Sequence, residues 1–133
     1  MSDLAALVVA LPIFGSLVAF LAALVRSKSG WPVAVVATVA QLAVAATLAA
    51  RAFGEGTISY VVGGFEAPYG IELVVDGLTA TMLVLIAAVS LGVLAYARRA
   101  GPRSNPFYAV FMLLVAGLTG ISVTADLFNM YVF

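Results

Sequence analysis

The 133-residue chain contains no cysteine and no histidine. Their absence excludes disulfide bonds, thiol chemistry and His- or Cys-based metal or haem sites within the chain, so we expect no metal and no cofactor. Charged residues are also scarce, at 9% of the sequence, and six basic side chains balance six acidic ones. A net charge of zero argues against nucleic acid as a partner. With so few reactive groups, we expect no catalytic residue and no enzyme.

The chain is instead rich in long apolar runs. Hydrophobic residues make up 65% of the sequence, and four runs contain no charged side chain: 4–25, 29–50, 77–97 and 104–125. An α-helix rises about 1.5 Å per residue and the hydrocarbon core of a bilayer is about 30 Å thick, so each run of roughly 20 residues can cross it once. The predicted fold class is an all-α membrane protein. We expect a single transmembrane domain over residues 1–133, with helices at about 4–25, 31–50, 77–97 and 106–125.

Basic residues lie in two of the connections between these runs. The connections after the first and third runs hold five of the six basic residues, namely Arg26, Lys28, Arg98, Arg99 and Arg103. The positive-inside rule places both connections in the cytoplasm, and hence the N-terminus and the segment from Arg51 to Asp76 outside. Arg51 is the one basic residue on the predicted outer side.

The predicted outer segment has the composition of short strands and tight turns. Residues 57–62 are followed by Gly63-Gly64, and residues 65–75 contain Pro68-Tyr69-Gly70. Glycine accepts positive φ, and proline presets the first residue of a turn. The pattern predicts a small β-hairpin lid between the second and third helices, and an irregular loop is the alternative.

Two acids flank the later apolar runs. Asp76 immediately precedes the third run, and Asp126 follows the fourth. A carboxylate in such a position can accept hydrogen bonds from the free N–H groups at a helix start. We interpret both as helix caps or membrane-rim acids, with proton handling as the alternative.

Small and weakly polar residues recur at helical spacing in two runs, which predicts close-packing faces. In the second run they are Ala34, Thr38, Gln41, Ala45 and Ala49. In the fourth run the face comprises Leu113, Gly117, Gly120 and Thr124. Helix packing is the expected role of Gln41, Gly117 and Gly120, and a part in transport is the alternative for Gln41.

The chain ends with seven helix-compatible residues, 127–133. They predict the start of a fifth helix, since seven residues cover only about 10 Å of a crossing. The alternative is a short interfacial anchor, for which Phe128, Tyr131 and Phe133 are suitable aromatic residues.

Four blocks of sequence carry a resemblance to a known family: Tyr60–Ile71, Val75–Ala80, Phe107-Tyr108 and Asp126–Phe133. In this order they resemble the antiporter-like subunits of Mrp-type sodium/proton antiporters, and the D subunit in particular. The same superfamily includes the proton-pumping membrane subunits of respiratory complex I and of membrane-bound hydrogenases.

The resemblance implies the N-terminal part of a larger helical subunit. In that family, helix five carries a buried glutamate paired with a lysine on a later helix, and alignment places this glutamate beyond Phe133. No ion-coupling residue is therefore expected within the chain itself, whose four complete runs contain no Asp, Glu, Lys or Arg.

The function that the resemblance implies is sodium/proton exchange across the cytoplasmic membrane by a multisubunit monovalent cation/proton antiporter. The expected partners are the other subunits of that complex and the lipid bilayer, with Na+ and H+ as the transported ions. One alternative is a proton-translocating subunit of an NADH-quinone oxidoreductase or a membrane-bound hydrogenase. The other is a structural membrane scaffold without transport activity of its own.

Overall fold

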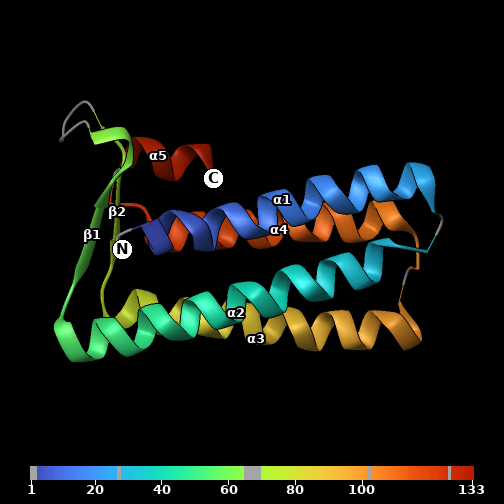
Figure 1. Cartoon of the computed structure of the whole chain (residues 1–133), viewed down its shortest axis with the longest axis horizontal. Coiled ribbons are helices and arrows are strands. Elements are labelled where there is room, and N and C mark those ends of the chain that lie inside the picture. The colour runs from blue at the N-terminus through green and yellow to red at the C-terminus, as the bar shows by residue number, and fades with distance from the viewer. Residues whose placement is uncertain (1–2, 27, 65–69, 102, 126) are drawn as a thin grey trace.

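The computed structural model describes residues 3–26, 28–64, 70–101, 103–125 and 127–133, which form an up-and-down bundle of helices with a β-hairpin at one end (Figure 1). Four helices in these ranges are long and apolar enough to cross a membrane, as the sequence predicts. The elements in chain order are α1 (Asp3–Val25), α2 (Gly30–Glu55), β1 (Ile58–Val61), the 3-10 turn η1 (Val62–Gly64), β2 (Glu72–Val75), α3 (Gly77–Ala100), α4 (Asn105–Val123) and α5 (Leu127–Val132).

The helix ends lie close to the predicted ones except at the end of α2. That helix continues to Glu55, five residues beyond the predicted end at Ala50. Arg51 and Glu55 interrupt the apolar run but are compatible with helical backbone, so they mark where the span becomes polar and not where the helix ends. The helix stops at Gly56, whose φ of 94° lies in the left-handed region that glycine adopts readily.

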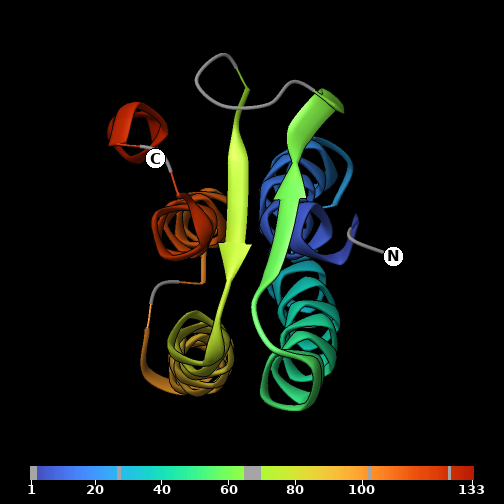
Figure 2. The same cartoon turned by 90° about the vertical axis from the view of Figure 1, so that its left-hand side faces the viewer.

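The four long helices stand at the corners of a bundle, with α1 against α2 and α4, and α3 against α2 and α4 (Figure 2). Small side chains fill much of the interior, and Ala5, Ala45 and Ala80 are fully buried. Such residues let helix backbones approach closely, which is the main source of attraction between helices surrounded by lipid. A hydrogen bond from Ser16 Oγ to the Ala109 carbonyl oxygen, at 2.7 Å, joins α1 to α4.

The predicted packing face of α2 lies in the interior, with Ala34, Thr38, Gln41 and Ala45 fully buried. The predicted face of α4 is wrong at Leu113, whose side chain is 57% exposed. The buried face of α4 instead comprises Asn105, Tyr108, Ala109, Met112, Val115, Ala116, Thr119, Gly120 and Val123. The small-residue stripe thus runs along the edge of the buried face, because Gly117 and Gly120 meet Phe133.

The predicted β-hairpin is confirmed, and the irregular-loop alternative is wrong for the paired strands. β1 and β2 pair antiparallel, with Ile58 opposite Val75 and Tyr60 opposite Leu73. The turn residues Pro68 and Tyr69 lie outside the described residues. The two strands cross the ends of the helices (Figure 2).

The hairpin covers the apolar interior at its end of the bundle. Leu73 and Val75 are buried and belong to the same core cluster as Val8, Leu48 and Leu83 from three different helices. Strand β2 also contacts the segment after α4, through a bridge between Leu73 and Thr124. The hairpin is therefore fixed to the bundle by both side-chain burial and backbone pairing.

The outer surface of the bundle is apolar. Large side chains on α1, α3 and α4 point outward, with Phe14, Leu85 and Leu114 between 53% and 63% exposed. A surface of this kind is unfavourable in water and is suited to lipid or to other membrane helices. The chain is a multi-pass membrane protein.

Charged side chains separate to the two ends of the bundle. We call the end with Arg26, Lys28, Arg98, Arg99 and Arg103 the basic end. The opposite end, which we call the hairpin end, carries Asp3, Arg51, Glu55, Glu72 and Asp76 among the described residues. Because α1, α2, α3 and α4 alternate in direction, both basic connections lie at the same end, as their predicted common location requires (Figure 1).

Candidate functional site

A small polar cluster lies inside the bundle between α2 and α4. Gln41 is fully buried, and its Nε2 donates to Thr119 Oγ1 at 2.8 Å. The Thr119 hydroxyl in turn donates to the Val115 carbonyl oxygen at 2.7 Å. Thr38, one helical turn before Gln41, donates to the Ala34 carbonyl oxygen.

This cluster is uncharged, and one of its atoms is unsatisfied. Gln41 Oε1 is buried and has no hydrogen-bond partner among the described residues. Neither an amide nor a hydroxyl side chain gains or loses a proton near neutral pH, so the cluster cannot carry a proton as an acid or base by itself. Its evident structural effect is to connect α2 with α4 across the interior.

Asp76 is the N-cap of α3 at the hairpin end. Its Oδ1 accepts a hydrogen bond from the Thr79 backbone N–H at 2.7 Å. The hydrogen bonds from Thr79, chiefly that of its backbone N–H, hold the pKa of Asp76 below its ordinary value. The carboxylate therefore stays ionised at neutral pH. Asp126, the second predicted cap, lies outside the described residues.

Gly117 and Gly120 meet the last residue of the chain. A Cβ added to Gly120 would overlap the Phe133 ring, and one added to Gly117 would lie 3.2 Å from the Phe133 carbonyl oxygen. These glycines thus make room for the segment that follows α4, which turns back beside that helix (Figure 1). Gln41 bonds to Thr119 in the interior, whereas the atoms nearest the Cβ positions of Gly117 and Gly120 belong to Phe133.

The described spans contain no charged side chain in their central turns. In α2 and α3 the charged residues occupy the last turns, and Asp3 begins α1. The described residues also contain no group of three or more Asp or Glu side chains that could hold a metal ion. The described interior therefore combines close helix packing with a neutral polar cluster.

The basic end contains an arrangement that the sequence pattern did not predict. Trp31 Nε1 donates to the Leu94 carbonyl oxygen at 2.9 Å, and the Arg98 guanidinium lies 4.0 Å from the centroid of the Trp31 ring. In the sequence, the basic residues indicate only membrane orientation. The single tryptophan beside them is the signal that could have revealed this site.

Asn105 fixes the backbone around this end. Its Oδ1 accepts from the Gly30 N–H at 2.9 Å, and its Nδ2 donates to the Arg26 carbonyl oxygen at 3.0 Å. One buried side chain at the start of α4 thus satisfies the backbone on both sides of the connection between α1 and α2.

No protein-family model matches the chain. Among curated proteins, it is 46% identical over 79 residues to the N subunit of the NADH-quinone oxidoreductase of Desulforudis audaxviator, covering 56% of this chain and 16% of that protein. It is 44% identical over 79 residues to the D subunit of a probable K(+)/H(+) antiporter of Rhizobium meliloti, covering 59% and 15% respectively. It is 37% identical over 102 residues to the D subunit of the Na(+)/H(+) antiporter of Alkalihalophilus pseudofirmus, covering 73% and 20%.

Two solved structures share the fold over nearly the whole chain. The structure of the Mrp complex from Dietzia sp. contains a chain that matches 98% of this one with a TM-score of 0.84 and 28% identity, over 24% of its own length. A chain of the membrane-bound sulfane sulfur reductase, described as an archaeal respiratory membrane complex, matches 98% of this chain with a TM-score of 0.89 and 26% identity, over 27% of its length.

These comparisons confirm the resemblance seen in the sequence. The chain is related to the antiporter-like membrane subunits of multisubunit complexes, and its relatives include the D subunits of sodium/proton antiporters. The chain spans only 15 to 20% of the length of the three curated relatives. Each of these three relatives is itself named as a subunit.

Proposed function

We propose that this chain forms part of a subunit of a multisubunit monovalent cation/proton antiporter that exchanges Na+ for H+ across the cytoplasmic membrane. The observation that carries the proposal is the combined likeness to the antiporter D subunit and to a chain of an Mrp complex. In this proposal the chain belongs to the N-terminal part of the subunit, and its partners are the other subunits of the complex.

The role of the described residues in such a subunit is structural. An ion-coupling site in a membrane needs buried ionisable groups, which are costly and are kept where transport requires them. The described spans have none in their central turns, so the coupling groups would come from other parts of the subunit or complex. The small-residue interior and the hairpin would hold the neighbouring helices in place.

A redox-driven proton pump is the second candidate function. The 46% identity to an NADH-quinone oxidoreductase subunit and the fold match to a respiratory membrane complex favour it. In that case the redox centres would be carried by other parts of the subunit or by partner proteins, since these 133 residues have no cysteine or histidine to ligate a metal or haem.

A chimera tests the two candidates against each other. The segment of the Alkalihalophilus pseudofirmus D subunit that aligns with this chain is replaced by residues 1–133, and the complete complex is expressed in cells lacking other sodium/proton antiporters. We expect everted vesicles from these cells to lose part of a preformed pH gradient when Na+ is added, read by acridine orange fluorescence. The matched control places the same residues in the N subunit of the Desulforudis audaxviator complex and measures NADH-driven proton pumping.

The outcomes separate the candidates. Exchange by the antiporter chimera without pumping by the oxidoreductase chimera supports the antiporter. The opposite result supports the redox pump and overturns the antiporter proposal. Sodium/proton exchange by the 133-residue chain alone would contradict the scaffold role, because the central turns of its described spans contain no charged side chain.

A further inference from the structure

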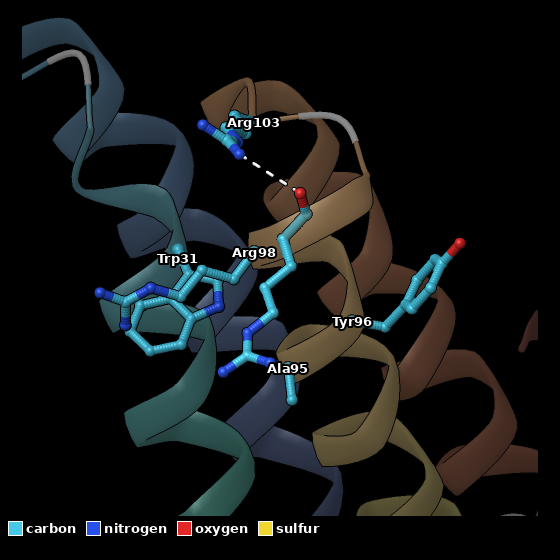
Figure 3. Close-up of a pocket in the computed structure, with 6 residues that line it drawn as sticks. Trp31, Ala95, Tyr96, Arg98 and Arg103 are labelled. Atoms are coloured by element: carbon cyan, nitrogen blue, oxygen red, sulfur yellow. Dashed lines mark hydrogen bonds between the residues drawn. The ribbon is translucent and has the colours of Figure 1, made fainter.

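The basic end holds a hollow that none of the roles described above uses. It is lined by side chains from the start of α2, the end of α3 and the connection to α4: Trp31, Ala95, Tyr96, Arg98, Arg99 and Arg103 (Figure 3). Its volume of about 880 Å3 falls within the ~300–1,000 Å3 usual for small-molecule sites. A second hollow beside it adds Lys28 to the same surroundings.

Three guanidinium groups at this hollow have no acidic partner among the described residues. The described residues of the basic end include no Asp or Glu, and no ion pair is formed there by Arg98, Arg99 or Arg103. Arg98 and Arg99 in the last turn of α3 are favourable beside the helix C-terminus, but that interaction does not account for Arg103 in the connection that follows. The concentration of positive charge therefore favours an anion from outside the chain.

Two of these arginines are held in place. Arg98 stacks on Trp31, whose ring is itself fixed by the hydrogen bond to the Leu94 carbonyl oxygen (Figure 3). Arg103 Nη2 donates to the Arg99 carbonyl oxygen at 3.3 Å. Stacking occupies the face of a guanidinium and leaves its N–H edge available, and that edge matches the oxygens of a phosphate.

The surface next to the hollow is suited to an acyl chain. Along α3, the exposed residues Ala88, Gly92 and Ala95 follow helical spacing toward Arg99, and a Cβ at Gly92 would meet nothing within 4 Å. They form a shallow apolar path on the exposed side of the helix. Val89 and Tyr96, which are 57% and 69% exposed, border it. A free phosphate ion would use only the arginines, whereas a phospholipid would use both features.

We propose that the hollow at the basic end binds the phosphate of an anionic phospholipid, with Arg98, Arg99 and Arg103 around the headgroup and an acyl chain along α3. Basic pockets between membrane helices are a recognised way to hold such lipids. The site depends on the chain crossing a membrane and not on which ions the complex moves.

Trp31 gives a direct measurement, because it is the only tryptophan in the chain and lies in the site. The full chain is placed in phosphatidylcholine vesicles that contain a minor fraction of phosphatidylglycerol brominated near the headgroup end of its acyl chains. Quenching of Trp31 is compared with that given by the same fraction of brominated phosphatidylcholine in otherwise identical vesicles. We expect the anionic lipid to quench as if enriched about threefold or more beside Trp31.

Variants identify the groups responsible. In the triple variant Arg98→Gln, Arg99→Gln and Arg103→Gln we expect quenching by the two lipids to become equal, with each variant normalised to its own unquenched fluorescence. Arg51→Gln, at the hairpin end, is the matched control for loss of charge and should keep the enrichment. Replacing the same three arginines by lysine should keep part of it, since the charge remains while the planar donor edge is lost.

Three results would overturn the proposal. Equal quenching by both lipids in the unaltered chain would mean that the hollow is simply a hydrated basic surface. Loss of the enrichment in Arg51→Gln would mean a general effect of net charge. Removal of the enrichment by inorganic phosphate, but not by chloride at the same ionic strength, would make the site one for a free anion and not for a lipid.

Discussion

Single small residues determine how closely the helices of this bundle approach one another. Gly15 on α1 is the clearest case, because a Cβ at this position would lie 2.7 Å from the Ala37 Cβ and 3.1 Å from the Met112 Cε. The Ala37 methyl group cannot rotate away from such a contact. The glycine is thus required by the packing of α1 against α2 and not by its backbone conformation.

Replacing Gly15 by alanine tests this close approach. We expect Gly15→Ala to lower the free energy of unfolding by about 1–3 kcal/mol, the usual cost of adding a methyl group to a filled interior. The measurement is unfolding in detergent followed by circular dichroism. Gly92→Ala is the matched control, since its Cβ would meet nothing within 4 Å and alanine favours the helix. Equal destabilisation by both variants would refute the packing role of Gly15.

The bond between Gln41 and Thr119 gives a second prediction at this scale. Gln41→Leu removes one interhelical hydrogen bond together with the unsatisfied Oε1, so we expect stability to change by less than about 1 kcal/mol. Thr119→Val leaves both ends of the buried amide without a partner and should cost about 1–3 kcal/mol.

The double variant completes that comparison. Gln41→Leu combined with Thr119→Val should recover most of the stability lost in Thr119→Val alone, as measured by the same unfolding experiment. A larger loss for Gln41→Leu than for Thr119→Val would contradict this account. Loss of ion exchange in the chimeric complex with Gln41→Leu, at unchanged stability, would instead favour the alternative of a role in transport.

The sequence reveals the buried side of α2 better than that of α4. On α2 small and polar residues coincide with the inward face, so spacing alone places Gln41 in the interior. On α4 the glycines used for the prediction lie against Phe133. The predicted face is therefore displaced by one residue from the buried Met112 and Thr119. The partner of Gln41 lies 78 positions away, and periodicity within one helix carries no information about such a distant contact.

At the scale of elements, the hairpin and the start of α3 act as one unit. β2 ends at Val75, whose side chain is buried in the core, and Asp76 then caps the helix that begins at Gly77. The direction in which the chain enters the bundle is therefore fixed on one side by apolar burial and on the other by a hydrogen bond from the Thr79 backbone N–H.

The cap at Asp76 predicts a pH-dependent stability. The folded-state pKa is lowered by hydrogen bonds from Thr79, so the stabilisation is present above the unfolded-state pKa and is lost as pH falls through the folded-state value. With an ordinary value of 3.8, the difference in Tm between the unaltered chain and Asp76→Ala should be full at neutral pH and shrink below about pH 4.

Asparagine at the same position separates capping from charge. Asp76→Asn keeps an acceptor for the Thr79 N–H at every pH, so its Tm should exceed that of Asp76→Ala throughout. Its Tm should fall below that of the unaltered chain only where the carboxylate is ionised. Melting curves in detergent from pH 3 to pH 7 give the comparison. A difference between the unaltered chain and Asp76→Ala that does not vary with pH would contradict the ionised cap.

The elements themselves were largely predictable, whereas their ends and contacts were not. An uncharged run as long as 77–97 predicts a membrane-spanning helix and little else. Glycine and proline between two apolar stretches predict a hairpin. The end of α2 was misplaced because Arg51 ends the apolar run without ending the helix. The bridge between Leu73 and Thr124 could not be foreseen, since it depends on where α4 returns to the hairpin end.

For the whole molecule, the separation of charge between the two ends is the feature that relates the bundle to the membrane. The basic end has five basic residues, and its described part has no acid, whereas Arg51 is the one basic residue at the hairpin end. Each basic group near an anionic cytoplasmic leaflet gains about 1 kcal/mol from attraction to the lipid headgroups. The excess of basic residues at the basic end over the hairpin end therefore favours a cytoplasmic location for the basic end. We therefore predict that the N-terminus and the hairpin face outward.

The absence of cysteine makes this orientation directly measurable, because a single introduced thiol is the only one in the chain. Thr57→Cys, exposed before β1, reports the hairpin end, and Ser104→Cys, exposed before α4, reports the basic end. A membrane-impermeant maleimide added to intact cells should modify Thr57→Cys at once and Ser104→Cys only after the cells are opened. The reverse pattern would contradict the predicted orientation.

The arginines of the basic end can be tested in the same way. If Arg98, Arg99 and Arg103 set the orientation, replacing all three by glutamine should make the labelling of both positions mixed, because only Arg26 and Lys28 then oppose Arg51.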